Sequence, residues 1–118
     1  MSGGFNDLEV WKKSKNLAVR IYNISKKFPK EDLYGITNQI RRSSLSIPSN
    51  IAEGSTRSSK KDFARFIQIA HGSCSELKTQ IIIAKEINIL DEINYNGIIK
   101  EIDEIGRMLK GLERSLSK

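Results

Sequence analysis

The chain of 118 residues carries 20 Lys and Arg against 14 Asp and Glu, which gives a formal net charge of +6 and a pI near 9.6. This length fits a single domain over 1–118 with a core of its own, and the basic excess favours partners that carry negative charge. The single cysteine, Cys74, excludes an intrachain disulfide and suits a reducing cytoplasm. Without a long apolar run or a signal-peptide pattern, secretion and membrane spanning are not expected.

The first predicted helix spans about 7–28, with Asn6 or Asp7 as its N-cap and Pro29 as its stop. One arc of this helix is apolar and is predicted to face the core: Val10, Trp11, Leu17, Ala18, Ile21, Tyr22, Ile24 and Phe28. The other arc is nearly all basic and is the candidate nucleic-acid-binding face: Lys12, Lys13, Lys15, Arg20, Lys26 and Lys27. The same pattern is also typical of a solvated face that keeps a protein soluble.

The second predicted helix spans about 31–54 and is expected to bend at Pro48 and to stop at Gly54. Its core stripe consists of isoleucines that keep their phase across the proline: Ile36, Ile40, Ile47 and Ile51. The opposite stripe is short-chained and polar: Arg42, Ser46, Ser49 and Glu53. Arg42 and Glu53 lie about 16 Å apart along a straight helix, so they cannot pair within it.

We interpret this polar stripe as a self-association surface in which Arg42 meets Glu53 of a neighbouring subunit, with a ligand pocket as the alternative. The full set of candidate interface residues is Arg41, Arg42, Ser46, Ser49, Asn50, Glu53 and Arg57. Asn50 has a second interpretation, because its amide can bond backbone carbonyls that Pro48 leaves without a donor.

The third and fourth predicted helices span about 59–88 and 91–116, with Ser58 or Ser59 capping the third and Asp91 preceding the fourth. Apolar side chains recur at helical spacing in the third helix: Phe63, Phe66, Ile67, Ala70, Cys74, Leu77, Ile81 and Ala84. They do so again in the fourth: Ile98, Ile102, Ile105, Leu109, Leu112 and Leu116. Short connections between long amphipathic helices predict an all-α, antiparallel up-down-up-down four-helix bundle.

Catalytic and metal-binding signals are weak. Arg65 and His71 resemble the Arg-x4-6-His signature of small helical ribonucleases, but they lie about 120° apart on one helix. His71 and Cys74 give two zinc-type ligands at i, i+3 without partners elsewhere in the sequence. We therefore expect no enzymatic activity, no metal and no cofactor.

Several motifs together resemble a known family. They are Leu8 and Trp11, Phe28-Pro29, Gln39-Ile40-Arg41-Arg42, Ser46-Ile47-Pro48, Asn50-Ile51-Ala52-Glu53-Gly54, Arg57, Ala70, Gly72-Ser73 and Glu76-Leu77. Over about residues 8 to 90 they look like the bacterial four-helix-bundle proteins encoded in intervening sequences of 23S rRNA genes. Ser43 and Ser44 depart from that pattern, which has alanines at these positions.

The resemblance implies a homopentamer related to the accessory variability determinant of diversity-generating retroelements, which binds nucleic acid and its reverse transcriptase. No defined enzymatic activity comes with this family. Residues and resemblance together lead to the hypothesis of a cytoplasmic, non-enzymatic, homo-oligomeric bundle that binds RNA or DNA through basic faces, without sequence specificity. The alternatives are a protein-protein interaction scaffold and, third, a small helical ribonuclease.

Overall fold

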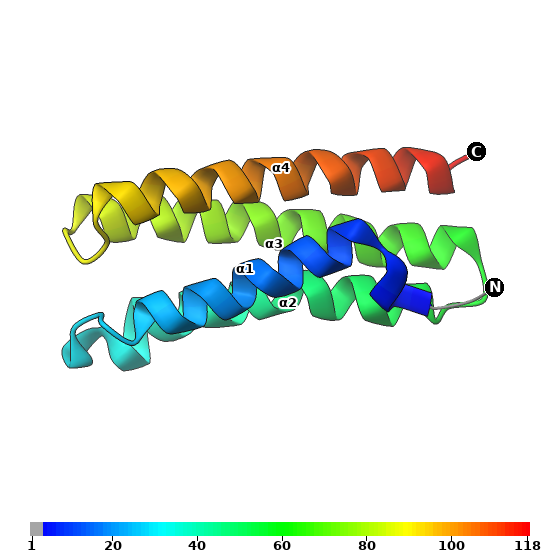
Figure 1. Cartoon of the computed structure of the whole chain (residues 1–118). Helices are drawn as coiled ribbons and strands as arrows, with labels where there is room; N and C mark the ends of the chain where they lie inside the picture. Colours follow the sequence, from blue (N-terminus) through cyan, green and yellow to red (C-terminus); the bar gives the residue numbers. More distant parts are fainter. Residues whose placement is uncertain (1–3) are drawn as a thin grey trace.

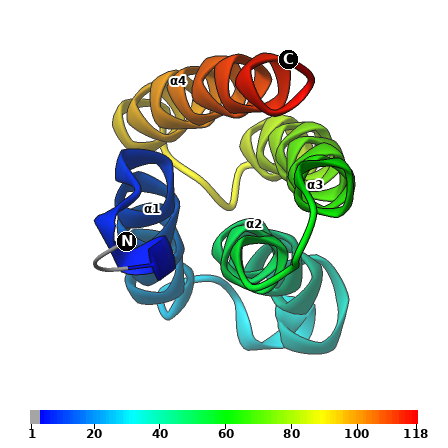
Figure 2. The same cartoon turned by 90° about the vertical axis from the view of Figure 1, so that its right-hand side faces the viewer.

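The computed structural model describes residues 4–118, which form an all-α four-helix bundle of 44 × 20 × 20 Å. The helices are α1 (Glu9–Ser25), α2 (Asn38–Ser55), α3 (Lys60–Glu86) and α4 (Glu92–Leu116). Figure 1 shows the chain running along the long axis in α1, back in α2, and again forth and back in α3 and α4. In the end-on view of Figure 2, α1 lies beside α2 and α4 and diagonally across from α3.

The apolar stripes predicted from helical periodicity meet along the axis of the bundle. Ile40, Ile47 and Ile51 of α2 are fully buried, as are Ile67, Ala70, Leu77 and Ala84 of α3. From α1 and α4 the core receives Val10, Leu17, Ile21, Ile98, Ile102, Ile105 and Leu109. Burial of apolar surface on this scale is the main stabilising contribution to a domain of this size. Among residues 4–118, no helix is long and apolar enough to cross a membrane.

Two predicted helix starts are confirmed by hydrogen bonds. The Ser59 hydroxyl accepts from the Asp62 amide at 3.1 Å, and the Asp91 carboxylate accepts from the Asn94 amide at 2.8 Å. These bonds satisfy donors that a helix leaves free in its first turn. The bond from the Asn94 amide also lowers the pKa of Asp91, because it stabilises the ionised carboxylate.

The predicted bounds of the first helix are wrong at both ends. Leu8, not Asn6 or Asp7, precedes α1, because Gly4–Asp7 forms a short 3₁₀ turn that places the Phe5 ring 5.0 Å from that of Trp11. At the other end α1 stops at Ser25, whose carbonyl accepts from the Phe28 amide in a turn. The third helix also ends earlier than predicted, because Asn88 adopts φ 66° and its amide bonds the Lys85 carbonyl.

The predicted second helix is interrupted before its middle. Lys30–Asp32 forms a 3₁₀ turn and Leu33–Thr37 a π-type turn, within which Gly35 leaves helical geometry with φ −112° and ψ −116°. The regular helix therefore begins at Asn38. It then continues through Pro48 to Ser55 and keeps Ile51 fully buried, as the phase of the isoleucines indicated. The bend at Pro48 stays a prediction.

Gly54 has a different role from the helix stop predicted for it. It lies buried inside α2, which ends one residue later at Ser55. A Cβ atom at Gly54 would lie 2.6 Å from Cβ of Phe66 and 2.9 Å from Cδ1 of Phe63. The missing side chain thus lets α2 approach α3 closely at this end of the bundle.

Candidate functional site

The basic face of α1 is only partly available to a partner. The Lys13 ammonium lies 3.1 Å from the Glu104 carboxylate, and the Arg20 guanidinium donates to Glu101 at 2.6 Å. Both acids belong to α4, so these pairs connect the first helix with the last. They satisfy two of the six charges predicted to bind nucleic acid, and reversing them would disturb the bundle as well as the surface.

A glycine lets the Arg20 side chain lie flat on α4. A Cβ atom at Gly97 would stand 2.8 Å from the Arg20 guanidinium. The pairing of Arg20 with Glu101 was not predictable from a wheel drawn for each helix alone, because it depends on which helices become neighbours. The sequence offers only a weak signal, which is that two acids three residues apart, Glu101 and Glu104, share one side of the fourth predicted helix.

The remaining cations of the predicted basic face stay at the surface, and Lys26 and Lys27 lie in the turn after α1 instead of on the helix. Lys12 lies 3.5 Å from Glu9 in the first turn, and the Lys15 ammonium donates to the Asn16 amide oxygen. Lys26 covers the ring of Tyr22 at 5.1 Å from its centroid. Lys27 forms no ion pair with any of residues 4–118. A phosphate-binding surface on α1 and the turn that follows it would therefore centre on Lys12, Lys15, Lys26 and Lys27.

The polar stripe of α2 does not stay together as one outer face. The Ser46 hydroxyl lies 2.8 Å from that of Ser73 on α3, and the Asn50 amide donates to both the carbonyl and the hydroxyl of Ser46. Asn50 thus bonds a backbone carbonyl, as one interpretation held, but Pro48 removes the donor from the carbonyl of Ser44 instead. Ser46 and Asn50 fix the contact between α2 and α3.

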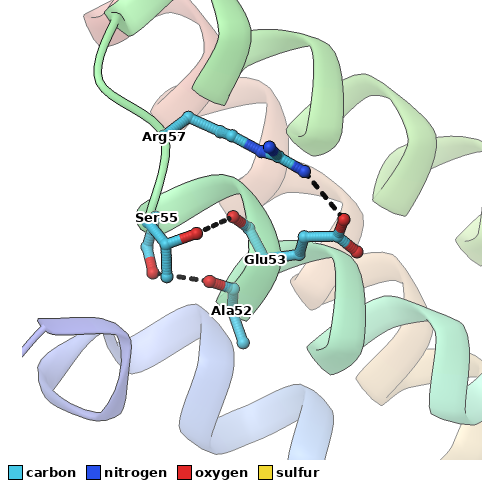
Figure 3. Close-up of polar contacts among 5 residues, drawn as sticks. Ala52, Glu53, Ser55 and Arg57 are labelled. Atoms are coloured by element: carbon cyan, nitrogen blue, oxygen red, sulfur yellow. Dashed lines mark hydrogen bonds and ion pairs between the residues drawn. The ribbon is translucent and has the colours of Figure 1, made fainter.

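At the C-terminal end of α2 the polar side chains bond within their own turn. Figure 3 shows the Arg57 guanidinium donating to the Glu53 carboxylate, at 2.8 Å. Arg57 also stacks on the ring of Phe66 at 4.7 Å. Because Glu53 already has this partner, the expected contact with Arg42 across a subunit boundary would have to compete with an existing ion pair.

Arg42 faces a polar groove between α2 and α3 of about 380 Å³. The groove is lined by Gln39, Arg42, Ser43, Ser46 and Glu76. Arg42 and Ser49 are exposed, and Arg42 forms no ion pair with any part of the chain that the structure describes. Of the seven candidate interface residues, these two alone are exposed and have no side-chain hydrogen bond or ion pair within residues 4–118.

An apolar groove between α1 and α2 was not predicted. It has a volume of about 270 Å³ and is lined by Lys15, Ala18, Val19, Tyr22, Arg41, Ser44, Leu45 and Pro48. Tyr22, expected in the core, is 52% exposed here, with the Arg41 guanidinium 4.6 Å from its ring centroid and bonded to Ser25. Position 22 lies at the edge of the apolar arc, beyond the strip that the neighbouring helices cover. The signal for this groove in the sequence is two apolar residues at outward positions, Val19 (54% exposed) and Leu45 (58% exposed).

The groove between α3 and α4 is larger, about 550 Å³, and mainly basic. Its lining residues are His71, Cys74, Ser75, Lys78, Ile102, Asp103, Gly106, Arg107, Lys110 and Arg114. Arg65, the partner of His71 in the ribonuclease interpretation, does not line it and lies 3.6 Å from Asp62 instead. Burial raises the pKa of the Cys74 thiol to about 12, which disfavours the thiolate that a metal ion requires. Over residues 4–118 no cluster of three metal-ligating side chains forms.

These features define a class of protein: a small basic four-helix bundle with an apolar groove on one side and a basic groove on another. The chain belongs to the 23S rRNA-intervening sequence protein family, whose model matches residues 6–111 and confirms the resemblance seen in the sequence. Its structure is similar to that of a protein of unknown function from the S23 ribosomal protein family of Bacteroides thetaiotaomicron VPI-5482. The TM-score is 0.83 with 28% sequence identity, over 89% of this chain and 95% of that one. No curated protein matches the chain.

Proposed function

We propose that this protein is a non-enzymatic, homo-oligomeric accessory factor that binds the backbone of RNA or DNA in the cytoplasm, without sequence specificity. The observation that carries the proposal is the charge left over after folding. Within residues 4–118, eight of the 20 Lys and Arg side chains form ion pairs, which leaves twelve cations against six carboxylates without one. An excess of exposed cations favours a polyanionic partner, and a phosphate backbone offers regularly spaced charges.

Absence of sequence specificity follows from the shape of the surface. Reading bases requires an element that enters a groove of the duplex or aromatic side chains that stack on single-stranded bases. The exposed cations of α1 and of the turn after it have long, flexible side chains and are spread along one side of the chain, which suits contacts with phosphates. Binding of this kind weakens steeply with salt, because each contact releases counterions.

The proposal is tested on α1 and the turn after it by reversing the charges of Lys12, Lys26 and Lys27 to Glu. We expect at least a tenfold loss of affinity for structured RNA at about 100 mM salt, and a salt slope smaller by about 2, because up to three phosphate contacts disappear. Thermal unfolding should hardly change, since exposed charges contribute little to stability. Fluorescence anisotropy over a salt series measures the affinity and the slope.

The matched control reverses Lys13 and Arg20 instead. These side chains pair with Glu104 and Glu101, so this variant should melt at a lower temperature than the wild type.

A wild-type protein that fails to bind RNA or DNA even at about 50 mM salt would contradict the proposal and favour the protein-protein interaction scaffold. RNA cleavage that disappears in His71→Ala would favour the ribonuclease.

Self-association is the second part of the proposal, and the apolar α1/α2 groove supports it. Val19, Tyr22 and Leu45 are each more than half exposed and lie together, and Lys15 and Arg41 border them. Contiguous apolar patches with a polar rim are typical of protein-protein contacts. The family resemblance favours a ring of five chains. A protein partner such as a reverse transcriptase is the alternative occupant of this surface.

We expect Leu45→Glu to disperse the oligomer while leaving the bundle folded. Leu45 is 58% exposed, so a carboxylate there costs a monomer little, whereas it would be desolvated in an apolar interface. Light scattering should report a multiple of 13.4 kDa for the wild type and the monomer mass for the variant at micromolar concentration. Ile93→Glu, at an 85% exposed site on α4, is the control and should leave the mass unchanged. A monomeric wild type would contradict this part of the proposal.

A further inference from the structure

The α3/α4 groove combines basic residues from two helices that pack side by side (Figure 2). On α3, His71, Lys78 and Lys85 follow each other at intervals of seven residues, and on α4 Lys100, Arg107 and Arg114 do the same. Seven residues are nearly two helical turns, so each row stays on one side of its helix, with steps of about 10.5 Å. The central members of both rows, Lys78 and Arg107, line the groove.

The ion pairs within the groove leave its arginines available. Lys78 lies 2.8 Å from Asp103, and Lys110 lies 3.6 Å from Glu113, which also accepts from Gln68. These carboxylates hold the two lysines against the walls. Arg107 and Arg114 are exposed and form neither an ion pair nor a side-chain hydrogen bond with any of residues 4–118.

The floor of the groove leaves room beneath the cations. Gly106 has no side chain, and the Nε2 atom of His71 lies 3.9 Å from where its Cβ would be. His71 is half-buried, while the Ser75 hydroxyl at the rim is exposed. The imidazole therefore borders the open groove, where it can form a hydrogen bond with a ligand or stack on it.

We infer that the α3/α4 groove binds the phosphodiester backbone of a nucleic-acid strand, with Arg107 and Arg114 as the principal phosphate ligands. The planar guanidinium offers two parallel donors to phosphate oxygens, whereas Lys78 and Lys110 line the same path but are paired with Asp103 and Glu113. The inference rests on the proposed function and adds a second site to it. Figure 2 shows the α3/α4 pair on the other side of the bundle from the α1/α2 pair, and the residues that line the two grooves do not overlap.

His71 makes the site directly observable, because it is the only histidine in the chain. In untagged, isotope-labelled protein, its ring C–H signals report on this groove alone. We expect these signals to shift or broaden on addition of an unlabelled, mixed-sequence, single-stranded RNA of about 20 nucleotides, whose backbone can follow a groove between two helices. If the RNA binds and the His71 signals stay unchanged, the groove is not the site, whereas the proposed function stands.

The same RNA, labelled with fluorescein, tests the arginines by anisotropy between about 50 and 300 mM KCl. The double variant Arg107→Ala/Arg114→Ala should lose at least tenfold in affinity at 100 mM, and its salt slope should fall by about 1.4, from two lost single-strand contacts. The control Lys30→Ala/Lys61→Ala removes the same charge at exposed positions outside the groove and outside α1, and should lose less than threefold.

Three outcomes separate the possibilities. Equal losses in the double variant and in the control would overturn the inference but not the proposed function. A wild type that binds no RNA at about 50 mM KCl would overturn both. Displacement of the RNA by millimolar inorganic phosphate at constant ionic strength would assign the groove to a phosphorylated small molecule and overturn the inference.

Arg107→Lys/Arg114→Lys should keep the salt slope and recover part of the affinity, since charge is retained and the planar fork is lost.

Discussion

Gly54→Ala should lower the free energy of unfolding by about 1–3 kcal/mol, the usual cost of forcing extra volume into a packed site. The added methyl carbon would lie 2.6 Å from Cβ of Phe66, an atom that is fixed to the backbone of α3 and cannot rotate away. Either α2 and α3 move apart, or Phe63 and Phe66 leave their positions. Urea denaturation followed by circular dichroism measures the loss, with the slope of the transition unchanged if only stability is affected.

Gly72→Ala is the matched control for this prediction. Gly72 lies inside α3, is exposed, and has no heavy atom within 4 Å of the position of a Cβ. The same chemical change should here stabilise the protein by about 0.5–1 kcal/mol, because alanine is the better helix former. If both variants gain stability, the close approach of α2 and α3 at Gly54 is not a constraint in solution.

Ser43→Ala should destabilise the bundle by about 1–3 kcal/mol, although alanine is what the family resemblance leads us to expect at this position, since a buried acceptor loses its donor. The Ser43 hydroxyl lies 2.7 Å from the amide oxygen of Gln80, between α2 and α3, and both side chains are at least 92% buried. Without this hydroxyl the Gln80 amide remains desolvated and loses a partner. Thermal or urea unfolding gives the magnitude.

A double-mutant cycle shows whether the loss comes from the unsatisfied amide. Gln80→Leu removes that group, and the double variant Ser43→Ala/Gln80→Leu should recover most of the stability lost in Ser43→Ala, because replacing both partners by apolar groups leaves nothing unpaired. Additive losses in the double variant would show that the bond contributes no more than the packing of its two side chains. Ser44→Ala, which removes only a bond to the Arg41 carbonyl on the same helix, serves as the reference.

The sequence was sufficient for the helices and for most of the core. Apolar spacing placed Ile47 and Ile51 in the core on either side of Pro48, and the caps Ser59 and Asp91 follow from local chemistry. Such features depend on one helix or one turn, where the distance between two residues along the chain determines their geometry.

The surfaces were harder to predict, because they depend on contacts between helices. A wheel drawn for α1 shows Lys13 and Arg20 as free cations, and one drawn for α4 shows a solvated face of mixed charge. Glu101 and Glu104 pair with Arg20 and Lys13 only because α1 and α4 pack side by side. The α3/α4 groove was hidden for the same reason, since Lys78 and Arg107 come from different helices and the seven-residue spacing within each helix does not show that the two rows line one cavity.

The two ion pairs between α1 and α4 also bear on how the chain folds during synthesis. Arg20 and Glu101 lie 81 residues apart in the chain, whereas each of the other neighbouring helix pairs is formed by consecutive helices. At a synthesis rate of about 5–20 residues per second, α1 waits several seconds before its acidic partners exist. Helices α1 to α3 can associate earlier, through contacts that are closer in sequence. The nascent protein therefore presents all the cations of α1 without their α4 partners until its last helix is made.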